Sequence, residues 1–423
     1  MLRRSFLAAS GGLPFALARG VAAQGASAQT AAPNEIKIGE VYSSSGAYAA
    51  ISLPVYNGMK LWADRLNADG GVFAKPYGRK IKIRLVGYDD QSQPATSTTM
   101  INQLITQDKV DILVANSGSV LAAAVMPVAR DNKMLLFNPT GSGLSLFSAD
   151  NPYMLLTSTP FSAEWPKWVA QFLAKEGPPN GIKRVALIYA TNEFTSTLAN
   201  AFRSMIKASG APLEFVYDQG VPTATSNYTV LINNIAAAKP DAVIALGYPN
   251  NDIAFLRNLG DSGVTFRWRF QVYPGIEPDE LAKSVGYAPM EGLFSFATAI
   301  DIDYKPDVGM PIGEYRAAWD KAYPEGRVEF GFNAIAGYNT GLVIERTLAT
   351  ADSMAQLELR RAAFALSGKM RTLNGPFELN AMGAQIGSVT PAGQLVSDGH
   401  GKLKMNVVWP PEVATAKAIY GAP

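Results

Sequence analysis

Apolar residues follow two alternating patterns along most of the chain. Residues 36–43 form a short apolar run, and the segment after it places Val55, Met59, Trp62 and Leu66 at helical spacing. Because strand-like runs and helix-like segments continue to alternate, we predict a parallel β-sheet covered by helices. Further strands of this first sheet are expected over residues 81–90, 111–117 and 134–138.

The alternation starts again after Pro160 and produces a second set of strands and helices. Two consecutive sets of similar make-up indicate an α/β protein with two doubly wound parallel-sheet lobes. The strands of the second sheet are expected over residues 184–190, 213–219, 241–248 and 268–273.

The last third of the chain is mostly helical, with helices predicted over residues 312–323, 333–351 and 355–367. This block forms either a third domain or a return of the chain to the first lobe. Short loops and the lack of a flexible Pro/Ser-rich linker favour the return. The extended pieces at 375–380 and 403–409 are then expected to join the second lobe.

The first thirty residues have the layout of a secretory signal peptide, with a basic start, an apolar stretch and then small residues. Arg3 and Arg4 stand in an Arg-Arg-x-Phe-Leu pattern, which is typical of twin-arginine export. Arg19 interrupts the apolar stretch, whereas a membrane anchor needs about 20 apolar residues. We therefore expect residues 1–28 to be cleaved off, leaving a periplasmic protein.

Charge and cysteine content exclude several classes of protein. The chain has 37 basic and 35 acidic residues, and loss of Arg3, Arg4 and Arg19 leaves 34 basic against 35 acidic ones. Such a balance does not favour binding to nucleic acid or to an anionic membrane. The chain has no cysteine, hence no disulfide and no residue to carry a lipid at the cleavage site. We expect an unanchored monomer.

Residues that carry catalysis are scarce. His400 is the one histidine and stands between two glycines near the C-terminus. With one histidine and no cysteine, the sequence offers no thiol nucleophile and no His/Cys metal cluster. It also matches no phosphate-loop or dinucleotide fingerprint. Asp89 and Asp90 at a strand end are typical of a solvated or helix-capping pair, with a metal or acid–base role as the alternative. We predict a protein that is not an enzyme and has no cofactor or metal.

Hydroxyl side chains follow two neighbouring strands of the first sheet. Ser117 and Ser119 come after one strand, and Thr140 and Ser142 after the next. Open α/β sheets bind ligands at these strand ends, where helix N-termini offer N–H groups to a carboxylate; a helix N-cap is the alternative role for any one hydroxyl. Aromatic residues in similar turns are expected to form an apolar wall: Tyr48, Trp165, Phe194, Tyr248, Tyr273 and Phe332.

Several stretches resemble the leucine/isoleucine/valine-binding family of periplasmic receptors. They include IKIGEVYSSSGAYA from Ile36, IKIRLVGYDDQSQPATS from Ile81 and VDILVANSGSV from Val110, and the likeness extends to about Trp409. The resemblance implies a type I periplasmic binding protein fold that captures a small molecule for the membrane subunits of an ABC importer. Alternatives are a sensor of amide- or urea-type ligands and a secreted α/β enzyme.

The resemblance also implies three hinge crossings between the lobes, at about 158–160, 297–300 and 376–380. Residues 34–158 and 299–376 would form the N-terminal lobe, and residues 159–298 and 377–423 the C-terminal lobe.

Matched residue by residue, the resemblance implies roles for part of the candidate site. The serine that holds the ligand carboxylate falls on Ser119. The hydroxyl beside the α-amino group falls on Ser142, with backbone from Thr140. Pocket aromatics of the second lobe fall on Phe194 and Tyr248, and Tyr48 lies in the first ligand loop.

One position departs from the family. Amino-acid receptors supply an acidic residue where this chain has Gly275, and Glu277 follows two residues later. Unless Glu277 substitutes through a shift of the loop, nothing pairs with an ammonium group, and burying it unpaired is costly. Cation–π contacts are the alternative way to hold an ammonium. We predict a preference for an aromatic or hydrophobic carboxylate over branched-chain amino acids.

Overall fold

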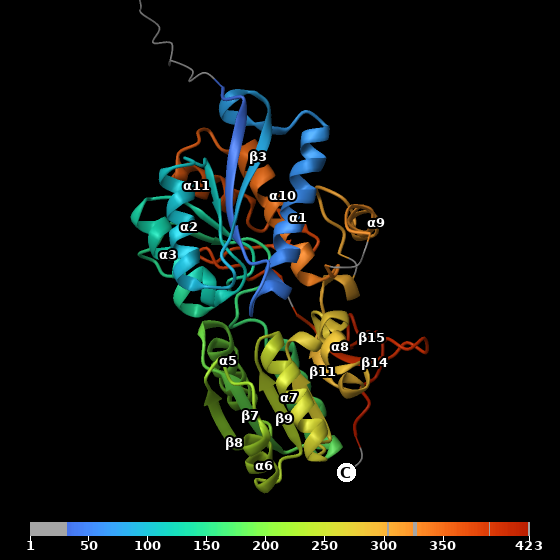
Figure 1. Ribbon diagram of the computed structural model, residues 1–423. Coiled ribbons are helices and arrows are strands. Elements are labelled where there is room, and N and C mark those ends of the chain that lie inside the picture. The colour runs from blue at the N-terminus through green and yellow to red at the C-terminus, as the bar shows by residue number, and fades with distance from the viewer. Residues whose placement is uncertain (1–31, 303, 325–327, 389, 422–423) are drawn as a thin grey trace, which may run out of the picture. The chain divides into compact units, whose positions relative to one another are not determined.

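The computed structural model describes residues 32–302, 304–324, 328–388 and 390–421 (Figure 1). The predicted signal peptide, residues 1–28, lies outside them. Two large β-sheets with their covering helices account for most of the described chain, which confirms the predicted class of fold. No helix in these ranges is long and apolar enough to cross a membrane.

The first sheet has six strands in the order β2-β3-β1-β4-β5-β6. Its strands run parallel except for β2, which pairs antiparallel with β3. Ile38 at the centre of β1 lies opposite Leu85 and Ile112 on its two neighbours. The strands are β1 (Glu35–Tyr42), β2 (Val72–Ala74), β3 (Arg79–Asp89), β4 (Ile112–Val114), β5 (Leu136–Asn138) and β6 (Met154–Leu156). The helices that follow or cover them are α1 (Ala49–Ala68), α2 (Pro94–Thr106) and α3 (Ser119–Asp131).

The second sheet has seven strands in the order β15-β14-β11-β10-β9-β7-β8. β14 and β15 are antiparallel additions to an otherwise parallel sheet. The strands are β7 (Arg184–Ala190), β8 (Glu214–Val221), β9 (Ala242–Leu246), β10 (Trp268–Gln271), β11 (Phe294–Phe296), β14 (Ala392–Ser397) and β15 (Leu403–Trp409). The helices are α4 (Lys167–Glu176), α5 (Glu193–Ser209), α6 (Thr229–Ala237), α7 (Pro249–Ser262) and α8 (Pro278–Val285).

The helical block returns to the first sheet instead of forming a third domain. Its helices are α9 (Ile312–Ala322), α10 (Phe332–Thr350) and α11 (Gln356–Leu366). In Figure 1, α10 runs beside α1, and the two helices are in extensive contact. Glycines permit this approach, because a Cβ atom on Gly337 would lie 1.9 Å from the carbonyl oxygen of Val55. α10 is therefore buried along most of its length.

Hydrogen bonds link the stretches that carry the chain between the two sheets. Phe161 N–H donates to Gln385 O (2.7 Å), and Ala297 N–H donates to Pro391 O (2.9 Å). Ala384 still belongs to the buried core of the first sheet. Residues 375–377 (β13) pair with 370–372 (β12) in a hairpin that keeps the chain in that lobe. We therefore place the third crossing after Ala384, later than the expected 376–380; the other lobe limits stay predictions.

Candidate functional site

A buried carboxylate organises the loops at the carboxyl end of the first sheet. Asp90 is fully buried and accepts a 2.6 Å hydrogen bond from Ser43 Oγ and another from the amide of Asn116. Asn116 Oδ1 in turn accepts from Ser52 Oγ (2.8 Å) and from Ser117 N–H (2.6 Å). This network holds the turn that leads into α3. No group of three or more acidic or histidine side chains in the described ranges could hold a metal ion.

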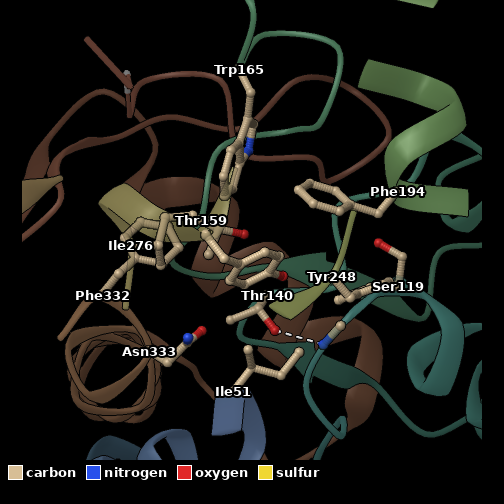
Figure 2. A pocket seen from close by; sticks show the side chains of 12 residues that line it. Ile51, Ser119, Thr140, Thr159, Trp165, Phe194, Tyr248, Ile276, Phe332 and Asn333 are labelled. Carbon is tan, nitrogen blue, oxygen red and sulfur yellow. Dashed lines mark hydrogen bonds between the residues drawn. The ribbon is translucent and has the colours of Figure 1, made fainter. Parts of the chain in front are cut away.

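The turns after β4 and β5 are tied to each other. Ser119, the first residue of α3, accepts two hydrogen bonds at Oγ, from Ser142 N–H (3.0 Å) and Gly143 N–H (2.9 Å). Thr140 Oγ1 accepts from Gly118 N–H at 2.8 Å, the dashed line in Figure 2. Gly118 adopts φ +83°, a backbone conformation that glycine tolerates best. The start of α3 is thus held rigidly at the edge of the sheet.

Tyr248 of the second lobe reaches over the start of α3. A Cβ atom on Gly118 would lie 3.3 Å from Tyr248 Oη. The hydroxyl is buried, and it has no hydrogen-bond partner of normal geometry among the described residues. Burial raises the pKa of Tyr248, an effect that the nearby N–H groups of Ser119 and Val120 partly offset. The phenol therefore stays protonated, with an unused O–H beside a helix N-terminus.

Both lobes contribute to a narrow cavity at this point (Figure 2). Five of the twelve lining residues are aromatic, and none carries an acidic or basic side chain. The lining consists of Ile51, Gly118, Ser119, Thr140, Thr159, Trp165, Phe194, Tyr248, Tyr273, Ile276, Phe332 and Asn333.

The aromatic side chains support one another edge to face. Trp165 meets Phe194 and Phe332 with ring centroids 5.2 and 5.6 Å apart and interplanar angles of 77° and 79°. Its Nε1–H donates to Pro160 O at 2.5 Å, which holds the ring in place. Tyr248 and Tyr273 stack at 5.9 Å. Such offset and edge-on arrangements stabilise rings beyond their buried area, so the wall is preorganised.

A buried acid positions the loop that carries Tyr273. Asp252 of α7 accepts hydrogen bonds from Tyr273 N–H (2.9 Å) and from Gln271 Nε2 (3.2 Å). Burial raises the pKa of Asp252 to about 8 despite these hydrogen bonds.

Most of the residues predicted from the sequence meet in this lining: Ser119, Thr140, Trp165, Phe194, Tyr248, Tyr273 and Phe332. The remaining four lie behind it. Tyr48 packs edge-on against Tyr248 at 5.2 Å, and Ser117 is buried in the Asn116 network. Ser142 pairs its hydroxyl with Ser162 Oγ at 2.7 Å.

The fourth, Glu277, turns away from the cavity. Its Oε1 accepts a 2.5 Å hydrogen bond from Asn333 Nδ2, and its Oε2 is buried without a partner in the described part of the chain. Burial and then the carboxylate of Glu329 raise the pKa of Glu277 well above its usual range. Position 275 has no room for an acidic side chain either, because a Cβ atom on Gly275 would lie 2.6 Å from Ser295 and Met405.

Sequence reasoning missed five lining residues: Ile51, Gly118, Thr159, Ile276 and Asn333. Each lies close in sequence to a residue or crossing that was predicted. Thr159 falls in the first expected crossing, and Asn333 follows Phe332. Scanning the neighbours of each predicted residue would have found them, at the expense of many false candidates.

Comparison with known proteins places this chain in a family. The model of the periplasmic binding protein family matches residues 35–399. The Leu/Ile/Val-binding protein homolog 8 of Brucella abortus is 24% identical over 292 residues. That alignment covers 65% of this chain and 66% of the relative, just under two thirds of its length.

Solved structures show the same fold. LivJ, a branched-chain amino acid transporter substrate binding protein from Streptococcus pneumoniae in complex with isoleucine, superposes with a TM-score of 0.71 at 18% identity, over 89% of this chain and 100% of that one. A solute binding protein from R. palustris in complex with benzoate gives 0.69 at 19% identity, over 88% and 95%. The match to the family model spans most of the chain, so this chain belongs to the periplasmic binding protein family, as the resemblance predicted.

Proposed function

We propose that this protein is a receptor that captures an aromatic or hydrophobic carboxylate between its lobes and delivers it to the membrane subunits of an ABC importer. One observation carries the proposal: the cavity lining has no charged side chain, yet it contains a helix N-terminus and an unused phenolic O–H.

The start of α3 offers hydrogen-bond donors for the carboxylate of the ligand. N–H groups at a helix N-terminus carry a partial positive charge and are satisfied by an anion. The protonated Tyr248 hydroxyl and the Ser119 hydroxyl, whose Oγ only accepts hydrogen bonds in this structure, are available as donors. Each hydrogen bond to a charged group contributes about 1.5–3 kcal/mol, so two or three of them hold a buried carboxylate.

The rest of the lining suits a ligand that is apolar apart from its carboxylate and that has no ammonium group. The aromatic rings and the side chains of Ile51 and Ile276 offer apolar surface. Glu277, the acid that could have paired with an ammonium group, contacts Asn333 and Glu329 and is not part of the lining. Among proteins of this fold, one from R. palustris holds benzoate and the pneumococcal LivJ holds isoleucine, and the uncharged lining here favours the former type of ligand.

Capture involves closure of the lobes about the linked crossings, as in other two-lobed receptors. We place the mature protein in the periplasm as an unanchored monomer, released from the signal peptide at residues 1–28.

Thermal unfolding with and without candidate ligands tests the proposal. A ligand at 100 times its dissociation constant stabilises the folded state by about 2.7 kcal/mol. We expect benzoate or a related aromatic acid to raise the unfolding temperature, and leucine, isoleucine and valine to leave it unchanged. Submicromolar binding of leucine or valine by calorimetry contradicts the proposal. A response to benzamide equal to that to benzoate favours the amide-type sensor, and turnover without ligand-induced stabilisation favours an enzyme.

A further inference from the structure

Asn333 is the one amide side chain in the cavity lining. It lies in the first turn of α10 and is 4% exposed. In Figure 2 it stands across the cavity from Ser119, so it faces the end of a ligand opposite the start of α3.

A contact behind the wall determines how this amide is oriented. Asn333 Nδ2 donates to Glu277 Oε1 at 2.5 Å, and Glu277 is 1% exposed. The Glu277 backbone is fixed as well, because its N–H donates to Tyr273 O at 2.8 Å. Since the amide group is planar, the position of Nδ2 determines that of Oδ1. No donor in the described residues reaches Oδ1, which leaves an acceptor available to a ligand.

The Glu277 carboxyl behind the Asn333 amide favours its neutral form over the charged one. Burial and the carboxylate of Glu329 raise the pKa of Glu277 well above its usual range, which favours the neutral form of the carboxyl. Since Oε1 accepts from Asn333, Oε2 is the oxygen left to carry the proton of that form. An ammonium group at this end of the cavity would have no counter-charge, whereas a neutral O–H donor needs none.

We propose that Asn333 is a specificity-determining residue whose Oδ1 accepts a hydrogen bond from a hydroxyl at the far end of the ligand. The preferred ligand class is then a hydroxylated aromatic carboxylate, and Glu277 acts as a positioning residue for the amide. This inference rests on the proposed function, since it takes the carboxylate at the start of α3 as the other end of the ligand.

Calorimetry with benzoate and its monohydroxylated isomers tests the assignment. We expect at least one isomer to bind the wild-type protein about tenfold more tightly than benzoate, because benzoate has no donor for Asn333 Oδ1. In Asn333→Leu this ratio falls to about one, whatever happens to the two affinities separately. Asn102→Leu, an exposed asparagine on α2, is the matched control and keeps the wild-type ratio.

Two variants of Glu277 separate positioning from general structure. Glu277→Gln retains a carbonyl acceptor for Asn333 Nδ2 and preserves the ratio, whereas Glu277→Leu frees the amide to rotate and lowers it. Equal affinities for benzoate and every isomer, or a preference that survives Asn333→Leu, overturns this inference alone. Absence of binding by all of these acids overturns the proposed function as well.

Discussion

The polar groups on the two sides of the cavity differ in whether they are hydrogen-bonded within the protein. On the first-lobe side, Asp90, Asn116 and Ser119 are hydrogen-bonded to neighbouring loops. On the second-lobe side, Tyr248 Oη lines the cavity and is buried without a partner in the described ranges.

The difference indicates which side of the cavity would gain hydrogen bonds from a ligand. A buried polar group without a hydrogen bond costs about 1–3 kcal/mol, so the second-lobe wall gains when a ligand completes its contacts. The first-lobe turns are satisfied beforehand and present a rigid set of N–H donors. We therefore expect first-lobe substitutions to affect both folding and binding, and second-lobe hydroxyl substitutions to weaken binding without lowering stability.

Removing the centre of the first-lobe network should have the largest effect. Asp90→Ala leaves the buried donors of Ser43 and Asn116 without an acceptor, and we expect the free energy of unfolding to fall by about 3–5 kcal/mol. Urea unfolding measures the change. The neighbouring Asp89 bonds the less buried Ser44, so Asp89→Ala is the matched control and should cost below about 1 kcal/mol. Equal losses in the two variants would contradict the role of Asp90.

Glu40 is an exception on the first-lobe side, because its Oε2 has no partner among the described residues. Burial raises its pKa from 4.5 to about 8. Between these pH values the folded protein holds a proton that the unfolded chain has lost, so the free energy of unfolding falls as pH rises and levels off above about 8.

Glu40→Gln removes this pH dependence. At the upper end of the range we expect the variant to be more stable than wild type by on the order of 3 kcal/mol, with the two converging at acidic pH. Denaturant unfolding across the pH range checks this. Glu35→Gln, at the partly exposed start of the same strand, keeps the wild-type slope. Parallel curves for Glu40→Gln and wild type would show that Glu40 does not titrate in this range.

Ser119→Ala should weaken aromatic carboxylate binding by about 1.5–3 kcal/mol, the range for a hydrogen bond to a charged group. Some stability is lost too, because the N–H groups of Ser142 and Gly143 lose their acceptor. Ser142→Ala should weaken binding less, since its hydroxyl pairs with Ser162 behind the wall. Unchanged affinity in Ser119→Ala, measured by calorimetry with the fold intact, removes Ser119 from the site.

Tyr248→Phe should give the smallest and most selective effect. The buried hydroxyl has no partner in the described part of this structure, so its loss should raise the free energy of unfolding of the ligand-free protein, by about 1 kcal/mol. Binding weakens by about 1.5 kcal/mol, the lower end of the range for a hydrogen bond to a charged group, because the ligand carboxylate loses one donor. Calorimetry together with urea unfolding separates the two quantities. A large loss of stability with unchanged affinity would erase the contrast between the two faces.

Local patterns in the sequence predicted a large share of this protein. Alternating strand and helix periods indicated two parallel sheets, because side-chain periodicity reflects which face of an element is buried. Hydroxyl and glycine residues after β4 and β5 predicted turns that contribute to the cavity lining, because parallel strands bring their carboxyl ends together. Cavity residues such as Ser119, Thr140 and Tyr248 could therefore be predicted from the sequence alone.

Tertiary structure alone decided how the side chains of the site are directed. The same loop sequence allowed Glu277 to face the cavity or to turn from it, and only the contacts with Asn333 and Glu329 settled the direction. Likewise, the hairpin formed by β12 and β13 delays the last crossing beyond Ala384. These outcomes depend on contacts between residues far apart in the chain, as in the Glu277–Asn333 pair separated by 56 residues, which local periodicity does not encode.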